Sequence, residues 1–100
     1  MPTLKTLALA RQILDHTGAA FARAERDRNR AIERVELSLT SYRTSPDPET
    51  IEAVRQASKA HDAAIQASMR AELLNGIAET LYEAVEAYLT ASHDARTGSA

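Results

Sequence analysis

The chain of 100 residues contains no cysteine and no tryptophan, and it has only four aromatic residues, three glycines and three prolines. The lack of cysteine excludes disulfides and thiol chemistry, and so few glycines and prolines leave little room for loops. No apolar run approaches the roughly 20 residues of a membrane-spanning helix. The first residues also lack the pattern of a secretory signal. We therefore expect a protein without a membrane span, either cytoplasmic or exported without a cleavable signal peptide.

Alanine dominates the residues that remain. Of the 44 apolar residues, 20 are alanine, so only 24 are large enough to fill a core. Alanine favours helix and permits close helix contacts, whereas a large buried core needs bulkier side chains. The composition predicts a single, all-α domain with a thin core.

One short stretch, Ser45–Thr50, contains the signals that predict a reversal of the chain. Pro48 fits the first position of a helix, where its missing N–H is not needed. Asp47 then lies at the N-cap and can accept a backbone hydrogen bond from the first turn. Pro46 disfavours helical angles at Ser45, which ends the preceding helix. Pro46, Asp47 and Pro48 are therefore the predicted turn residues.

The fold predicted from these signals is a long antiparallel helical hairpin. The first helix spans about 3–44 with Thr3 as its N-cap, the turn spans 45–47, and the second helix spans about 48–92. We expect the first helix to continue through Gly18. Residues 1–92 form the predicted domain, and residues 93–100 lack apolar positions and are expected to be a flexible tail.

Apolar residues follow a different period in each arm. Positions 7, 14, 21, 28, 35 and 42 step by seven, and all except Arg28 are large and apolar, which is typical of a helix that packs on another helix. In the second arm the stripe steps by four from His61 to Val85, so it drifts around the helix. The predicted interaction seam comprises Leu7, Leu14, Phe21, Val35, Leu39, Ile65, Met69, Leu73, Ile77, Leu81 and Tyr88.

A reversal about residue 47 predicts the register of the two arms. Facing residues then have numbers that sum to about 94, which pairs Gly18 with Gly76. Two opposed glycines would allow the helices to approach closely. The same rule pairs Ala10 with Ala84 and Ala31 with Ala63.

Several leucines lie outside these stripes, at positions 9, 37, 74 and 89. Two helices of roughly 60 Å cannot cover each other on all sides. A hairpin alone would leave these leucines in water. We therefore expect a homodimer that completes a four-helix bundle, or a helical protein partner.

Charge is divided unevenly between the two arms. Residues 1–46 carry eight Lys or Arg against five Asp or Glu, and residues 47–100 carry four against nine. A basic belt is defined by Arg23, Arg26, Arg30 and Arg34, and an acidic group by Glu79, Glu83 and Glu86. The two sets could dock between chains, in which case high salt should weaken assembly. Because acidic residues alternate with the arginines, nucleic-acid binding by the belt is kept as the alternative function.

No pattern in the chain indicates catalysis. The three histidines, His16, His61 and His93, have no carboxylate three or four positions away, as a helical metal site requires. No serine or threonine is placed for nucleophilic chemistry, and no phosphate-binding glycine motif is present. We expect a non-enzymatic protein without metal, cofactor or small-molecule substrate; a ferritin-like metal enzyme is the third class considered.

Two families of secretion proteins resemble parts of the chain. Leu74–Tyr88 resembles the second helix of the WXG100 family of type VII secretion, and Tyr82-x-x-x-Glu86 is similar to that family's Y-x-x-x-D/E export signal. The W-x-G turn of the family is replaced here by Pro46-Asp47-Pro48. The opening Asp47-Pro48-x-x-Ile51-x-x-Val54 instead resembles the turn of type III needle and inner-rod subunits. Both resemblances imply a bacterial helical hairpin that works through protein contacts as a secretion-system component, chaperone or structural subunit.

Overall fold

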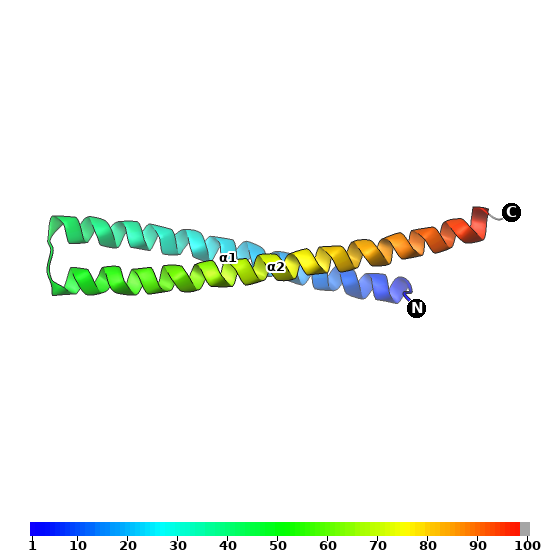
Figure 1. Cartoon of the computed structure of the whole chain (residues 1–100), viewed down its shortest axis with the longest axis horizontal. Helices are drawn as coiled ribbons and strands as arrows, with labels where there is room; N and C mark the ends of the chain where they lie inside the picture. The colour runs from blue at the N-terminus through cyan, green and yellow to red at the C-terminus, as the bar shows by residue number, and fades with distance from the viewer. Residues whose placement is uncertain (99–100) are drawn as a thin grey trace.

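The computed structural model describes residues 1–98, which form two long helices joined by a sharp reversal (Figure 1). Helix α1 spans Leu4–Thr44 and helix α2 spans Pro48–Gly98. The helices run antiparallel and pack against each other along their length, so the predicted all-α hairpin is confirmed. The molecule measures 80 × 17 × 13 Å and has a radius of gyration of 22.3 Å. A compact domain of this length would have a radius of about 13 Å, so the protein is a thin rod.

The ends of the helices agree with those predicted from the sequence, except at the C-terminus of the second helix, α2. α1 is continuous through Gly18, as expected. α2 continues to Gly98 instead of ending near residue 92, so six of the eight residues expected to form a flexible tail are helical. Ser99 and Ala100, the rest of that predicted tail, lie outside the described residues.

Side-chain caps fix both helix starts. At α1, the Thr6 N–H donates to Thr3 Oγ1 at 3.3 Å, and the Thr3 N–H donates to Thr6 Oγ1 at 3.0 Å. At α2, the Thr50 N–H donates to Asp47 Oδ1 at 2.9 Å, and the Asp47 N–H donates to Thr50 Oγ1 at 3.0 Å. Each pair satisfies N–H groups that a helix start otherwise leaves without partners. Asp47 is therefore the N-cap that the sequence predicted.

Replacing Asp47 with alanine should lower the free energy of unfolding by about 1 kcal/mol, because the Thr50 N–H loses its side-chain acceptor. Asp47→Asn is the matched control, since its amide oxygen accepts the same bond and asparagine is an equally good N-cap. Urea unfolding followed by circular dichroism at 222 nm measures both. An equal loss in the two variants would show that the carboxylate charge, and not the cap bond, matters.

The interface between the helices follows a strict alternation of three- and four-residue steps. On α1 the half-buried or buried positions include Leu7, Ala10, Leu14, Thr17, Phe21, Ala24, Arg28, Ala31, Val35 and Ser38. On α2 they include Val54, Ala57, His61, Ala64, Ser68, Ala71, Asn75, Ala78, Tyr82, Val85 and Leu89. This average step of 3.5 keeps one stripe turned toward the partner helix when the two helices wind around each other. Every seventh residue of α2 from 57 to 78 is alanine, and these small side chains keep the two helices close together.

The apolar stripe of α2, whose members are spaced four residues apart, turns away from this interface because of that spacing. Each step of four residues turns about 40° beyond one full helix turn. The stripe is therefore half-buried at His61 and Ile65, exposed from Met69 to Leu81, and buried again at Val85. The sequence predicted the drift, but not that a small-residue stripe of seven-residue period would face α1 instead.

Candidate protein–protein interface

Half of the predicted interaction seam lies between the two helices. The α1 members Leu7, Leu14, Phe21, Val35 and Leu39 are all half-buried, as is Ile65 of α2. The α2 members Met69, Leu73, Ile77 and Leu81 are 46–65% exposed, and Tyr88 is also exposed. The Tyr88 hydroxyl donates a hydrogen bond of 2.9 Å to the sulfur of Met1. The structure thus divides the predicted set into residues that hold the hairpin together and residues that α1 does not cover.

The predicted pairing of two glycines is wrong. Gly18 lies against α2, where a Cβ atom would be 3.6 Å from Asn75 Oδ1. Gly76 is exposed, and a Cβ atom there would meet nothing within 4 Å. Ala63 and Ala84, the other residues predicted to face α1, are exposed as well. An error of one or two residues in the predicted register explains all three wrong pairs. Consecutive residues of a helix point about 100° apart, so a small shift moves a residue out of the interface.

Polar side chains occupy the middle of the interface. The buried Ser68 hydroxyl, 2% exposed as a residue, donates to Glu25 Oε1 at 2.5 Å. The other carboxylate oxygen of Glu25 accepts from Arg28 at 2.9 Å. About two turns further along the rod, the Thr17 hydroxyl lies 3.1 Å from both Asn75 Oδ1 and the Leu14 carbonyl oxygen. The Ser68–Glu25 and Thr17–Asn75 bonds connect α1 to α2 at fixed levels and so define the register.

Sequence reasoning missed these cross-helix polar contacts. Only Arg28 stood out, because it interrupts the seven-residue series of large apolar residues. A signal for close helix contact was present in a second seven-residue series, shifted from the first by three positions. This series, 10, 17, 24, 31 and 38, holds only small residues. Small residues at one interface position allow the close approach that a short serine or asparagine side chain needs to reach the opposite helix.

The outer face of α2, defined as Met69, Leu73, Gly76, Ile77, Thr80, Leu81 and Ala84, is an exposed apolar surface. Its large residues form a ridge with a spacing of four, and Gly76, Thr80 and Ala84 form a parallel row of small residues beside it. A shallow groove runs between the two rows, with Glu72 at its margin. Rows of this spacing are the ridges and grooves through which helices pack on one another.

Gly76 destabilises α2, and no close contact among the described residues requires a glycine at this position. Glycine within a helix is destabilising by about 1 kcal/mol relative to alanine. Nothing lies close enough to Gly76 for an alanine methyl group to clash. The space that Gly76 leaves opens outward into the groove.

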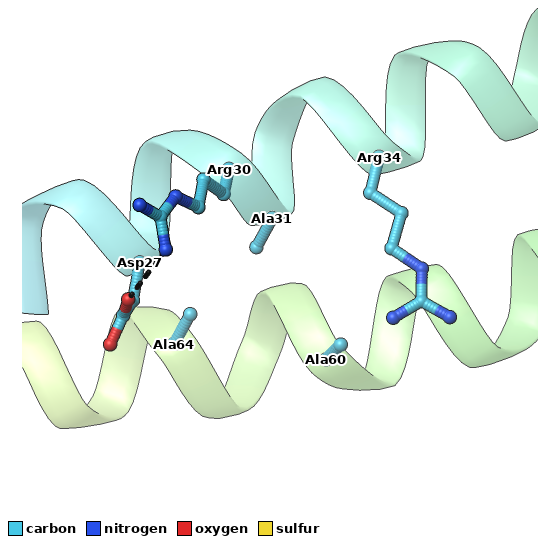
Figure 2. Close-up of a pocket in the computed structure, with 6 residues that line it drawn as sticks. All are labelled: Asp27, Arg30, Ala31, Arg34, Ala60 and Ala64. Carbon is cyan, nitrogen blue, oxygen red and sulfur yellow. Dashed lines mark ion pairs between the residues drawn. The ribbon is translucent and has the colours of Figure 1, made fainter.

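The basic belt and the acidic group lie at different levels of the rod. Within residues 1–98, Arg30 pairs weakly with Asp27 at 3.9 Å, while Arg23, Arg26 and Arg34 form no ion pair. Figure 2 shows Arg34 reaching from α1 toward α2 beside a recess floored by Ala31, Ala60 and Ala64. Glu79, Glu83 and Glu86 are exposed further toward the open end, where Glu79 accepts a long bond of 3.5 Å from Asn75. One hairpin therefore does not bring the two charged sets together.

One charged side chain at the open end has a shifted pKa. The guanidinium of Arg11 lies 5.6 Å from the centre of the Tyr82 ring and 3.3 Å from an Asp15 carboxylate oxygen. Its interaction with Tyr82, and then the charge of Asp15, raise the pKa of Arg11. Arg11 thus stays positively charged and stacks on α2.

Candidate metal-ligating side chains are dispersed over residues 1–98. No three His, Asp or Glu side chains within residues 1–98 are grouped so that they could hold a metal ion. The imidazole of His61 lies 3.8 Å from the carboxylate of its neighbour Asp62. Over the same residues, neither helix has an apolar segment long enough to cross a bilayer. The notable property of this molecule is its surface.

That surface is unusually large. The chain exposes 7460 Å², whereas a compact monomer of 10.9 kDa would expose about 5,600 Å². A standard protein interface covers about 800 Å² on each partner, so the excess is enough for at least one such contact.

Comparison with models of protein families, with curated proteins and with solved structures finds no significant match for this chain.

Proposed function

We propose that this protein is a non-catalytic interaction module that binds other helices through the outer face of α2. The observation that carries the proposal is the unpaired apolar ridge of Met69, Leu73, Ile77 and Leu81 beside its groove. Large contiguous apolar surfaces on soluble proteins commonly mark interaction sites. The ridge has the four-residue spacing through which one helix packs on another, so the expected partner surface is helical.

Within this class, we propose a small structural subunit or chaperone of a bacterial secretion system. The rod-like hairpin and the resemblances carried by Tyr82-x-x-x-Glu86 and by Asp47-Pro48 support this role. The thin, elongated body and the exposed helix faces of this chain are features that a subunit of an extended assembly can use.

The alternative is a nucleic-acid-associated protein that uses the basic belt. It is favoured by Arg23, Arg26 and Arg34, which form no ion pair within residues 1–98 and are exposed. Phosphate contacts by such arginines would make binding strongly dependent on salt. A gel shift at physiological salt separates the two functions, because the interaction module should leave DNA and RNA unshifted.

A photo-crosslinking amino acid placed at Ile77 tests the main proposal in the organism that makes the protein. Irradiation should yield a discrete adduct, because Ile77 is an exposed ridge residue that lines the groove. The matched control carries the same group at Ala19, an exposed position on α1 away from the apolar ridge. If position 77 gives no more adduct than position 19, the proposed function is wrong.

A further inference from the structure

We propose that copies of this chain stack on one another, parallel and in register, with one side of the hairpin against the opposite side of the next copy. Each of these sides is formed by both helices along the seam between them, and neither is the outer face of α2. This inference therefore goes beyond the proposed function. Charge and shape at mid-rod support it, over residues 20–37 of α1 and 55–72 of α2.

Three Arg-x-Glu triplets give the two sides opposite charges. They are Arg23-Ala24-Glu25 and Arg34-Val35-Glu36 in α1, and Arg70-Ala71-Glu72 in α2. The middle residue of each triplet is half-buried against the other helix. Because consecutive residues of a helix point about 100° apart, the arginine lies to one side of that middle residue and the glutamate to the other. The two helices are antiparallel and face each other, so all three arginines fall on the same side of the rod.

The side with the arginines carries the recess floored by alanines, which Arg30 and Arg34 line (Figure 2). Over the two ranges, this basic side is defined by Arg23, Arg30, Arg34 and Arg70, with Asp27 as its one carboxylate. The acidic side lies opposite and is defined by Glu25, Glu36, Asp62 and Glu72, with Arg28 and Arg55 as its two arginines. One hairpin thus has a positive side and a negative side at the same level.

Both sides keep charges that have no partner in their own chain. Within residues 1–98, no ion pair engages Arg34 or Arg70 on the basic side, or Glu36 or Glu72 on the acidic side. A two-fold contact brings identical surfaces together, so on either side it would place like charges against each other. A stack places the basic side against the acidic side, where opposite charges attract. The charge pattern therefore selects a second copy in the stacked arrangement.

The same triplets set the direction and the register of the stack. When the second copy is parallel and unshifted, α1 lies on α1 and α2 lies on α2. The arginine of each triplet is then only two residues, about 3 Å along the axis, from the glutamate of the same triplet in the next copy. This alignment brings all three pairs together at once, which is why we place the copies parallel and in register.

Shape favours the same alignment. The recess on the basic side is floored by small residues, among them Ala31 and Ala64. Ile32 and Ile65 follow these two alanines by one residue, so they lie on the acidic side at the level of the recess. Ile32 is 37% exposed and Ile65 is half-buried. In the stack, the isoleucines of one copy lie over the alanine floor of the next, and apolar surface on both is removed from water.

The apolar floor also distinguishes a protein from a nucleic acid as the occupant of the basic side. A phosphate backbone would bring no apolar group to the recess, and Asp27 in its wall would repel phosphate. A stacked copy supplies both carboxylates and apolar side chains. Because one basic side and one acidic side remain free at the two ends of any stack, this contact does not close at two copies, and assembly is open-ended.

Sedimentation velocity of the full chain tests the stack. In roughly 20 mM salt, where exposed charges are weakly screened, the average mass should keep rising with concentration beyond about 22 kDa, twice the mass of 10.9 kDa. In roughly 500 mM salt the association constant should fall at least tenfold. A chain that stays monomeric at about 100 µM in low salt, or a mass that levels off at two copies, would overturn the proposal.

Charge reversal shows which surfaces meet. Arg34→Glu with Arg70→Glu makes both sides acidic, and Glu36→Arg with Glu72→Arg makes both sides basic. Each double variant should lose at least tenfold in self-association, because like charges then face each other. An equal mixture of the two should assemble again, since acidic and basic copies alternate. If the mixture stays unassembled, the two sides do not meet and the proposal is wrong.

The matched control is Arg26→Glu with Lys59→Glu, which changes the net charge by the same amount as the first double variant. These exposed residues lie two positions after the inward-facing Ala24 and Ala57, so they point away from the other helix and from both sides. The control should assemble like the wild type, and circular dichroism at 222 nm should show that every variant is helical. An equal loss in the control would mean that net charge, and not the position of the charges, governs assembly, which contradicts the stack.

Carbodiimide coupling measures the register. Arg70→Lys keeps the charge and provides an amine, which should form an amide with Glu72 of the next copy. The two side chains point about 200° apart on one helix, so they do not couple within a chain. Mixing normal and nitrogen-15-labelled copies identifies the linked peptides as intermolecular by mass. Coupling to Glu79 or Glu83 instead of Glu72 would overturn the in-register stack. A gel shift of DNA or RNA by the wild type that the reversed arginines abolish, without self-assembly, would assign the basic side to nucleic acid and overturn it as well.

Discussion

Ala57→Leu should destabilise the hairpin by about 2–3 kcal/mol, the largest effect that we expect from a single substitution. Ala57 is completely buried, and it begins the series of alanines that lets α2 lie close to α1. A leucine there adds three carbon atoms to an interface without space for them. Overpacking of this kind typically costs about 1–3 kcal/mol, and here the two helices also have to separate over neighbouring turns. For a domain of this size, whose stability is usually about 5–15 kcal/mol, the loss is large.

The matched control is Ala63→Leu, six residues further along the same helix. Ala63 is exposed, and alanine and leucine have similar helix propensities, so this variant should change stability by less than about 0.5 kcal/mol. Urea unfolding of both variants at one protein concentration gives the comparison. Equal stabilities would mean that the close approach of the helices at Ala57 does not hold the hairpin together.

The sequence predicts the hairpin because its strongest local signals agree with each other. Pro46, Asp47 and Pro48 end one helix and begin the next, and Thr3 caps the first. These signals act within a few residues of the chain, so no tertiary information is needed. The α1 stripe was predictable for the same reason, since Leu7, Leu14 and Phe21 are both large and correctly spaced.

The α2 side of the interface was not predictable, because large apolar residues are the usual guide to burial. Among the described residues of α2, the buried ones are the small Ala57, Ser68 and Ala78 together with the larger Val85, while Leu73 and Ile77 are exposed. Burial here follows from the shape of the contact more than from the hydrophobicity of each residue. Where α1 supplies bulky side chains at Leu14, Phe21 and Val35, the alanines of the 57–78 series let α2 lie close to it. Only the pairing of the two helices contains that information.

The candidate interface was predictable in part. The sequence indicated that leucines would be left uncovered, and the helical partner inferred from them stays a prediction. It did not indicate that Met69, Leu73, Ile77 and Leu81 would form one outward ridge, or that Gly76 would open a groove beside them. Those features depend on which side of α2 meets α1, which the register errors at Gly76 and Ala84 obscured.

Glu25→Ala should lower stability by about 1–2 kcal/mol, because it removes the acceptor that connects the two helices at mid-rod. Ser68 would lose its charge-assisted bond of 2.5 Å to the Glu25 carboxylate. Arg28 would lose its partner at 2.9 Å. A buried hydroxyl without a partner costs about 1–3 kcal/mol, and the value here is toward the lower end because serine in a helix can turn to a carbonyl of its own helix.

A double-mutant cycle isolates the cross-helix bond from the local ion pair. Glu25→Ala, Ser68→Ala and the double variant should show a coupling of about 1 kcal/mol, since the second substitution removes a group that has already lost its partner. Glu52→Ala is the matched control: Glu52 pairs with Arg55 at the same three-residue spacing, at 3.1 Å, but its pair is exposed and local to α2. We expect a change of only about 0.2–0.5 kcal/mol there. If Glu25 and Glu52 gave equal losses with no coupling to Ser68, the mid-rod contact would not determine how the two helices are aligned.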